Sequence, residues 1–357
     1  MKAAVLEEFG KPLSVCDVPA PVLGTGEVLV DVVAAGVLPY AAEVFRGERN
    51  YQLTLPVVPG AGAVGRVRAT GPDATRLKPG DWVLCDPTIR SRDDALTPDI
   101  TLQGLSARGE GGLFLQRHFG HGAYAEQLLV PTENAIPLGP VDPADAGRWI
   151  ALTVCLVPYG GFLAADLRPG ETVLVSGATG NFGSAAVAVA LAMGAACVVA
   201  PGRNEAALAD LDRRFGERVR TVRLTGDDDT ARLRKAAPGP IDVVLDLLPP
   251  SAGTDAVRAA AMTVRESGRV VLMGGVGMLG GGDLALPYPW LMRNNITVRG
   301  QWLAPRTATA SLIALARAGL LDLGRFAVTE FELDDIAAAL DHAAGTAARF
   351  ALTVVRP

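Results

Sequence analysis

Cysteine is scarce in this sequence of 357 residues, and no two cysteines form a Cys-x-x-Cys pair; the four are Cys16, Cys85, Cys155 and Cys197. This spacing excludes a disulfide framework and a cysteine-rich zinc lobe. Basic residues are not in excess, because the formal net charge is −5, so no basic face for nucleic acid is expected. No uninterrupted apolar run reaches the length of a membrane span, and the first five residues read as a strand without a secretory signal. We therefore expect a cytoplasmic protein without nucleic-acid or membrane partners.

What is abundant is apolar sequence, at 49% of residues against 20% charged, in a chain long enough for two domains. The most informative stretch reads VLVSGATGNFG over residues 173–183. It predicts a buried strand, a glycine turn, and a helix over residues 184–193. A second strand is expected at 197–199, so one βαβ unit fits within about thirty residues.

This turn has the composition of a pyrophosphate site. Gly177 permits the turn, Gly180 lets the backbone approach a ligand, and Gly183 lets the helix pack close to the strand. Free N–H groups at the helix start would point at phosphates. The alternative is an ordinary strand-to-helix turn, but the surrounding βα pattern favours dinucleotide binding, with these candidate residues: Gly177, Ala178, Thr179, Gly180, Asn181, Phe182 and Gly183.

The rest of the chain separates into two patterns. Residues 1–130 read as short strands between Gly/Pro turns, which indicates an antiparallel, barrel-like domain. Residues 86–120 form a polar insert that we interpret as an irregular surface lobe, and residues 137–145 are a Pro/Gly-rich connection. Strands and helices alternate afterwards, which predicts an α/β doubly wound parallel sheet. Helices are expected at 205–215, 230–236, 254–264, 307–318 and 334–344, and strands at 219–224, 241–246, 269–273, 296–302 and 350–355.

Nine short motifs in order resemble the medium-chain dehydrogenase/reductase superfamily over essentially the whole chain. They include GEVLV at 26–30, AAGV at 34–37, PVVPG at 56–60, KPGDWV at 78–83, GAYAE at 122–126, the glycine turn and GRVV at 268–271. The resemblance implies a GroES-like β-barrel domain over 1–145 and 304–357, and a Rossmann domain over 146–303. It also implies hydride transfer with a nicotinamide cofactor and, as a default, a homodimer.

The departures from this family concern zinc. Its zinc alcohol dehydrogenases carry the first ligand cysteine where this chain has Leu38, and the ligand histidine with its neighbouring glutamate where it has Ala61 and Gly62. In these relatives the third ligand cysteine lies six residues before a tyrosine. If Tyr159 is that tyrosine, Thr153 occupies the third ligand position. Leucine and alanine cannot bind Zn²⁺. The sequence therefore predicts no metal and resembles the zinc-independent branch, which includes quinone oxidoreductases and enoyl reductases, although that branch often has asparagine in place of Leu38.

The second strand of the glycine-turn unit ends without a carboxylate to bind ribose hydroxyls; Arg203 and Asn204 follow it. A guanidinium suits a 2′-phosphate, so NADPH is the predicted cofactor, with Arg203 as a solvated residue the alternative. The glycine-rich run at residues 274–282 would approach the nicotinamide in this family, which adds Gly274, Gly275 and Val276 to the cofactor residues.

Without a metal, the reacting end needs a proton donor. Tyr40 and Tyr51 are the catalytic candidates, since both resemble positions that face the reaction in relatives; packing within the barrel is the alternative. Structural or surface roles are expected for His118 and His121. Large side chains that could line an apolar substrate cleft, or could be core, are Leu38, Tyr40, Phe114, Trp149, Tyr159, Trp290 and Met292.

These observations predict an NADPH-dependent, zinc-independent oxidoreductase that transfers hydride to an activated C=C or C=O of an enone, quinone or related carbonyl. One alternative is a metal-free alcohol or imine redox enzyme acting on a bulky cyclic substrate. Another is a non-catalytic NADPH-binding protein, because a fold does not by itself supply activity.

Overall fold

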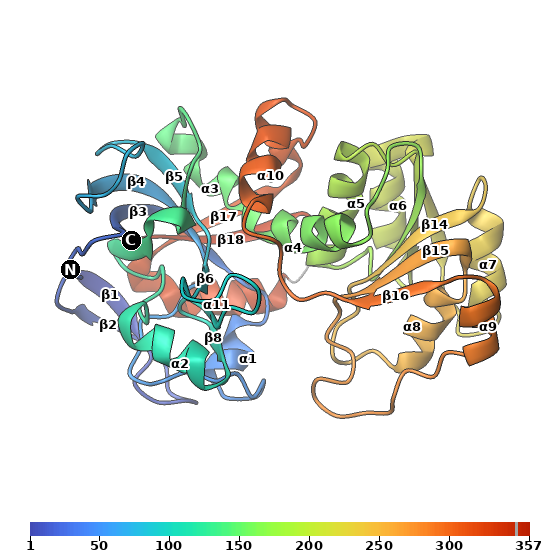
Figure 1. The fold of residues 1–357 in the computed structure, drawn as a ribbon, viewed down its shortest axis with the longest axis horizontal. Helices are drawn as coiled ribbons and strands as arrows, with labels where there is room; N and C mark the ends of the chain where they lie inside the picture. The colour runs from blue at the N-terminus through green and yellow to red at the C-terminus, as the bar shows by residue number, and fades with distance from the viewer. Residues whose placement is uncertain (347–348) are drawn as a thin grey trace. The chain divides into compact units, whose positions relative to one another are not determined.

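The computed structural model describes residues 1–346 and 349–357, which divide into two compact units (Figure 1). The first unit contains residues 1–153, 323–346 and 351–357, and the second contains residues 154–322 with 349–350. We expected the boundaries at 145/146 and 303/304. They fall later because the helix α4 (Ala151–Ala164) carries the chain across the first boundary and α10 (Ala308–Arg317) groups with the second unit.

The first unit is built on a sheet with the strand order β10-β5-β4-β3-β18-β17, in which β9 also pairs with β3. Burial alternates along the middle of β4, where Gly65 and Val67 are buried and Arg66 and Arg68 are exposed, so one face of this strand packs in the core. The strands are β3 (Glu27–Val37), β4 (Ala63–Thr70), β5 (Trp82–Cys85), β9 (Gln127–Pro131), β10 (Ala135–Pro137), β17 (Ala327–Glu332) and β18 (Ala351–Arg356), with β1 (Lys2–Val5) and β2 (Ser14–Asp17) pairing separately. The C-terminal strand β18 pairs antiparallel with β3, so the chain returns to the first unit as expected.

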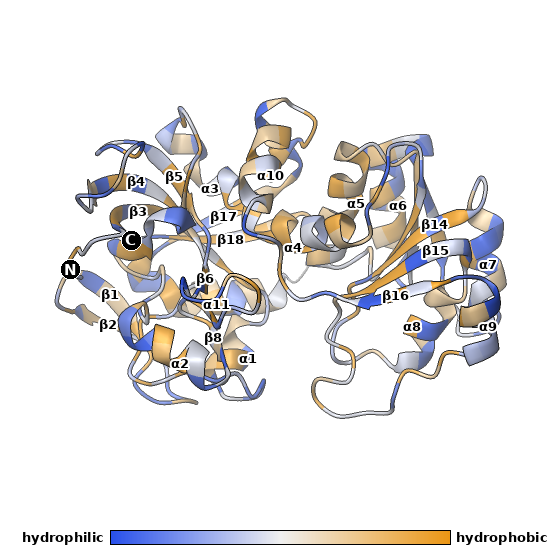
Figure 2. Cartoon of the chain, in the orientation of Figure 1, coloured by the Kyte–Doolittle hydropathy of each residue, from blue (hydrophilic) through white to orange (hydrophobic). Residues whose placement is uncertain are grey.

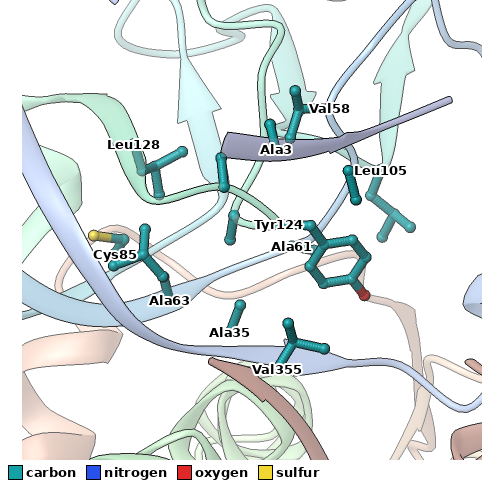
Figure 3. Packing of buried hydrophobic residues seen from close by; sticks show 14 of the residues in the cluster. Ala3, Ala35, Val58, Ala61, Ala63, Cys85, Leu105, Tyr124, Leu128 and Val355 are labelled. Carbon is teal, nitrogen blue, oxygen red and sulfur yellow. The ribbon is translucent and has the colours of Figure 1, made fainter. Parts of the chain in front are cut away.

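Small side chains surround one aromatic ring in the core of the first unit. Tyr124 is fully buried, with Ala35 and Ala63 from neighbouring strands in the same cluster (Figure 3). A methyl group on Gly60, which has φ +108°, would lie 2.6 Å from Cδ1 of Tyr124. Only glycine therefore leaves room for this ring. The helices of this unit are α1 (Ala41–Phe45), α2 (Gly109–His118), α3 (Ala146–Trp149) and α11 (Ile336–Gly345).

The sequence predicts an irregular lobe at residues 86–120, but this lobe has regular secondary structure. It forms a three-stranded antiparallel sheet of β6 (Thr88–Arg90), β7 (Ile100–Leu102) and β8 (Ser106–Arg108), followed by α2. The buried amide of Gln103 donates hydrogen bonds to the carbonyls of His121 and Leu129, at 2.9 and 2.8 Å. Polar contacts of this kind leave no apolar periodicity in the sequence, which is why the sequence pattern indicated an irregular lobe.

The second unit is a six-stranded parallel sheet in the order β13-β12-β11-β14-β15-β16. In Figure 2 the labelled strand β14, one of the two central strands, is largely apolar, and both central strands are buried, as expected for a sheet covered on both faces. The strands are β11 (Thr172–Ser176), β12 (Cys197–Gly202), β13 (Val219–Arg223), β14 (Ile241–Asp246), β15 (Val264–Leu272) and β16 (Thr297–Gly300). The other helices are α5 (Asn181–Ala192), α6 (Glu205–Phe215), α7 (Asp229–Ala236), α8 (Thr254–Ala261) and α9 (Tyr288–Arg293). This strand order is that of a doubly wound fold, which confirms the predicted class.

Two further differences concern helices. The helix expected over 254–264 ends at Ala261, because Val264 already pairs with Ile241 at the start of β15. The continuous helical stretch Pro143–Ala164 has the length and composition of a membrane span, at 22 residues and a mean hydropathy of 1.3. In its most apolar window 67% is buried inside the protein, as in a core helix, so length and composition are weak evidence for a membrane here.

Candidate functional site

The glycine turn joins β11 to α5 by close backbone contact. Gly177 has φ +87°, and its carbonyl accepts a hydrogen bond from Gly180 N at 3.0 Å. A methyl group on Gly183 would lie 1.9 Å from the Gly177 oxygen, so no larger residue fits there without moving the helix. By contrast, a methyl group on Gly180 would meet only that oxygen, at 3.5 Å. The turn is thus tight on its inner side and open at Gly180.

The start of α5 carries glycine at its N-cap and no side-chain cap. Helix N-termini attract anions because their N–H groups and the helix dipole both favour negative charge. Ala178 is buried and Thr179 is half-buried within the turn, with the Thr179 methyl close to Gly202 at the end of β12. The residues present therefore fit the diphosphate of a dinucleotide, the group that this fold implies.

Two arginines lie where β12 and β13 end. Arg203 is exposed directly after β12, and Arg223 ends β13 in register with Gly202. Arg223 pairs with Glu205, which reduces its free positive charge. Asn204 caps α6 by accepting a hydrogen bond from Ala207 N at 3.0 Å, a role that the sequence interpretation had not assigned to it. Arg223 was also missed, although its position as the last residue of a neighbouring strand was the available signal.

The predicted nicotinamide segment follows β15. Gly274, Gly275 and Val276 are half-buried, and Gly275 N donates to the Leu248 carbonyl at 2.8 Å. A methyl group on Gly274 would lie 2.4 Å from Oδ2 of Asp246, at the end of β14. The segment therefore packs directly on the carboxyl edge of the sheet, beside the strand that neighbours β11.

The positions that carry zinc ligands in zinc relatives gather in the first unit but hold no donor set. A methyl group on Gly62 would lie 3.2 Å from Cγ2 of Thr153, and one on Gly36 would lie 3.8 Å from Oγ1 of Thr153. The Thr153 hydroxyl donates to the Ile150 carbonyl at 2.8 Å. Leu38, two residues beyond Gly36, packs against the core of this unit. The alkyl side chains of Leu38 and Ala61 and the internally bonded hydroxyl of Thr153 do not fit zinc.

Two buried cysteines, Cys85 of the first unit and Cys155 of the second, are the remaining thiols to consider. Cys85 and Cys155 are buried, and burial raises the pKa of the Cys85 thiol to about 12 and raises that of Cys155 as well. Burial in apolar surroundings favours the neutral thiol at both positions over the thiolate that zinc binds. Across residues 1–346 and 349–357, no three His, Cys, Asp or Glu side chains are grouped to hold a metal ion.

The two candidate tyrosines are in contact. The rings of Tyr40 and Tyr51 lie edge to face with centroids 6.4 Å apart, and their hydroxyls are hydrogen-bonded. Burial, followed by the charge of Tyr51, raises the pKa of Tyr40, while Arg49 lowers it. The Arg49 guanidinium stacks 4.3 Å above the Tyr40 ring and pairs with Glu43 at 2.7 Å. Sequence reasoning missed Arg49, although it lies only two residues before Tyr51.

The other candidates have varied surroundings. His118 pairs with the buried Glu27, and His121 Nδ1 accepts a hydrogen bond from Val58 N at 3.2 Å, so both have the structural partners expected of them. Trp149 is half-buried in α3 of the first unit. Trp290 packs against the core of the second unit. Among the other apolar candidates, Tyr159 is buried, whereas Phe114 and Met292 are exposed.

Comparison with known proteins agrees with the fold of the two units. The family model "Alcohol dehydrogenase GroES-like domain" matches residues 24–140, and "Zinc-binding dehydrogenase" matches residues 182–318. An alcohol dehydrogenase of Rhizobium meliloti is 30% identical over 329 residues, covering 89% of both chains. The chain belongs to the medium-chain dehydrogenase/reductase superfamily. It is thus an alcohol dehydrogenase-like oxidoreductase, and a nicotinamide cofactor is expected of this family.

Other members of the superfamily are similar over comparable lengths. An NAD-dependent alcohol dehydrogenase of Sulfurisphaera tokodaii is 25% identical over 336 residues, and an acryloyl-coenzyme A reductase of Metallosphaera sedula is 28% identical over 320 residues. Each alignment covers 89% of this chain and 90% of the relative. The solved alcohol dehydrogenase from Thermus sp. ATN1 superposes with a TM-score of 0.82 at 25% identity, over the full length of both chains.

Proposed function

We propose that this protein is a zinc-independent, NADPH-dependent reductase that acts on an activated C=C or C=O, such as that of an enone or quinone. The observation that carries the proposal is the replacement of the zinc ligands by Leu38, Ala61 and Thr153 in a unit that holds a hydrogen-bonded tyrosine pair. An oxidoreductase without a Lewis acid needs another way to stabilise negative charge on oxygen. A phenol hydroxyl can do so by donating a hydrogen bond or a proton.

The cofactor would be held mainly by backbone. The glycine turn and the start of α5 suit the diphosphate, and Arg203, with Arg223 nearby, suits the 2′-phosphate. When bound, the nicotinamide supplies a hydride. The preference for NADPH rests on Arg203 and on the absence of a carboxylate at the end of β12, and it is a proposal because relatives of this chain include NAD-dependent enzymes.

Tyr40 and Tyr51 would hold a proton at the substrate oxygen. Because burial raises the pKa of Tyr40, its hydroxyl stays protonated throughout the neutral range and is available as a donor. Its hydrogen bond to Tyr51 connects the two hydroxyls, so a proton lost from one can be replaced through the other. Arg49, stacked on the ring of Tyr40, opposes the pKa increase and would stabilise developing negative charge on that phenol.

Conjugation makes a C=C or C=O electrophilic without a metal, which is why activated acceptors suit this residue set. The similarity to an acryloyl-coenzyme A reductase supports the same substrate class, since that relative's name describes reduction of a conjugated acyl group. A homodimer also belongs to the proposal. It is supported by β16, which is an edge strand of the parallel sheet with all four residues exposed.

The decisive experiment combines elemental analysis with a cofactor-oxidation screen. We expect less than about one zinc per ten subunits, no effect of chelators, and NADPH oxidation with at least one enone or quinone. The panel should also contain ketones, aldehydes and cyclic imines. A stoichiometric zinc that activity requires, or turnover of simple alcohols alone, would refute the proposal. Binding of NADPH without turnover of any compound would identify a non-catalytic binding protein instead.

A further inference from the structure

One buried carboxyl group in the second unit has no role in the proposed chemistry. Asp246 is the last residue of β14 and is 3% exposed. It lies in parallel register with Ser176, the last residue of β11. The chain crosses to opposite sides of β11 to form β12 and β14, so this pair of strand ends is the topological switch point of the sheet. Ligands of doubly wound sheets bind at the carboxyl ends of the strands at this point.

The Asp246 carboxyl is only partly satisfied. The Ser176 hydroxyl and the Leu248 N–H donate hydrogen bonds to it, but its Oδ1 has no partner within the described part of the chain. Burial outweighs these two hydrogen bonds and raises the pKa of Asp246 to about 6. An unpaired buried carboxylate is costly, so protonation relieves a real penalty at this site.

Both glycine segments of the proposed cofactor site contact the backbone around Asp246. Leu247 N donates to the Ser176 carbonyl at 3.0 Å, and a methyl group on Gly177 would lie 3.0 Å from the Leu247 oxygen. On the other side, Met273 N donates to the Asp246 carbonyl at 3.1 Å, and Gly274 packs on Oδ2. The carboxyl group therefore lies between the diphosphate turn and the predicted nicotinamide segment.

Among the residues that the structure describes, no cation compensates a negative charge at Asp246, and the shift in its pKa has no contribution from a charged neighbour. The strand β11, the helix α5 and the segments 177–183, 247–250 and 273–276 contain no charged residue, and α4 contributes only the titratable groups of Cys155 and Tyr159. The charged residues on the adjacent elements are Asp242 on β14, Arg265, Glu266 and Arg269 on β15, and Asp255 and Arg258 on α8. Asp242 pairs with Arg265, and Arg269 pairs with Glu171.

We propose that Asp246 is a positioning residue of the cofactor site, and that the protein binds its anionic dinucleotide most tightly when this carboxyl group is protonated. The inference rests on the proposed function only in requiring that a dinucleotide binds the glycine turn. A buried carboxylate next to a diphosphate site repels the ligand, and the repulsion is weakly screened because both charges lie out of bulk water. In the protonated form, the carboxyl group keeps its contacts with both glycine segments without this repulsion.

The sign of the pH dependence follows by linkage. A bound anion raises the pKa of Asp246 above its value of about 6 in the free protein, so binding takes up a proton. The protonated carboxyl group gives its full gain in dinucleotide affinity below pH 6. This gain is lost as the pH rises through the higher pKa that Asp246 has in the complex. We expect affinity about tenfold weaker at pH 8 than at pH 5.5, since a repulsion of roughly 1.4 kcal/mol corresponds to a factor of ten in the dissociation constant.

Isothermal titration with NADP⁺ and with ADP-ribose tests this inference without measuring activity. ADP-ribose has no phosphate that titrates near pH 6, unlike the 2′-phosphate of NADP⁺. Wild-type protein should lose about tenfold in affinity for ADP-ribose between pH 5.5 and 8 and take up protons at pH 7. The isosteric, neutral variant Asp246→Asn should bind about tenfold more tightly than wild type at pH 8, with no pH dependence.

Two further variants separate charge from structure. Ser176→Ala removes one donor from the carboxylate, so it should move the loss of affinity to higher pH, a shift that general destabilisation would not produce. Asp242→Asn, at the other end of the same strand, should keep the wild-type pH profile. A wild-type profile in Asp246→Asn, or an unshifted one in Ser176→Ala, would overturn the inference while leaving the proposed function intact. Failure of wild type to bind either probe would overturn both.

Discussion

The two units differ in whether they have the residues that form the ligand sites of their family. The second unit keeps its site, because the turn from Gly177 to Gly183 is made by backbone contacts and by the absence of side chains. The first unit has Leu38, Ala61 and Thr153 at the positions where, by resemblance, zinc relatives carry ligands.

The difference teaches that a backbone site and a side-chain site differ in how they can be lost. A site made of N–H groups disappears only when the local fold changes, since nearly every residue carries the same N–H group. A metal site disappears when two or three side chains change, and the surrounding sheet is unaffected. We propose that the tyrosine pair supplies the chemistry that zinc supplies in the zinc relatives.

The largest effect should follow from blocking the backbone site. Gly183→Ala places a methyl group where only 1.9 Å separates it from the Gly177 oxygen, so we expect cofactor affinity to fall more than a hundredfold. Gly180→Ala is the matched control, because its methyl group has 3.5 Å of clearance at φ −87°, and it should cost less than about tenfold. Titration with NADPH measures both. Equal losses in the two variants would contradict the description of the turn.

The next largest effect should come from substitutions in the tyrosine pair, and these should change kcat more than cofactor affinity. Tyr40→Phe or Tyr51→Phe, whichever removes the proton donor, should lower kcat about a hundredfold and leave NADPH affinity unchanged. Tyr288→Phe, an exposed tyrosine of the second unit, is the control. Because the pKa of Tyr40 is raised, kcat should show no tyrosine titration between pH 7 and 9. Losses below threefold in both variants would remove tyrosine acid catalysis from the proposal.

A smaller effect on cofactor binding is expected from Arg203, an exposed side chain that we propose contacts the 2′-phosphate. Arg203→Ala should weaken NADPH binding by roughly ten- to a hundredfold and leave NADH binding nearly unchanged, because a charge-assisted contact to the 2′-phosphate is worth about 1.5–3 kcal/mol. Arg223→Ala should cost less, since Arg223 is already paired with Glu205. The ratio of the two dissociation constants is the measurement. An unchanged preference in Arg203→Ala would show that the NADPH assignment is wrong.

The smallest effect should come from the lobe of the first unit, which we expect to be structural. Arg92 binds Glu133 through two hydrogen bonds and the Gly26 carbonyl through a third. Arg92→Ala should lower stability by about 1 kcal/mol, because these groups are partly exposed to water, and should not change NADPH affinity. Thermal unfolding with and without NADPH checks both statements. A change in affinity would mean that the lobe takes part in the site.

Much of the fold follows from local sequence. The strand 241–246 and the helix 205–215 were predicted at the residues where they occur, because each has a strong period and clear boundaries. The lobe was not predicted, because buried polar groups such as Gln103 hold it together and polar contacts have no sequence period. The division of the chain at 153/154 was also missed, because apolar sequence in α4 is the same on both sides of that boundary.

The sequence alone determined the family, the glycine turn and the loss of zinc ligands, because each depends on residue types at fixed spacings along the chain. Only the tertiary structure decided which of those residues meet. It placed Arg49 on Tyr40, and it put the buried carboxyl of Asp246 between two glycine segments that lie about a hundred residues apart in sequence. The reason is physical, because a side chain's charge state depends on burial and on neighbours that folding brings from distant strands.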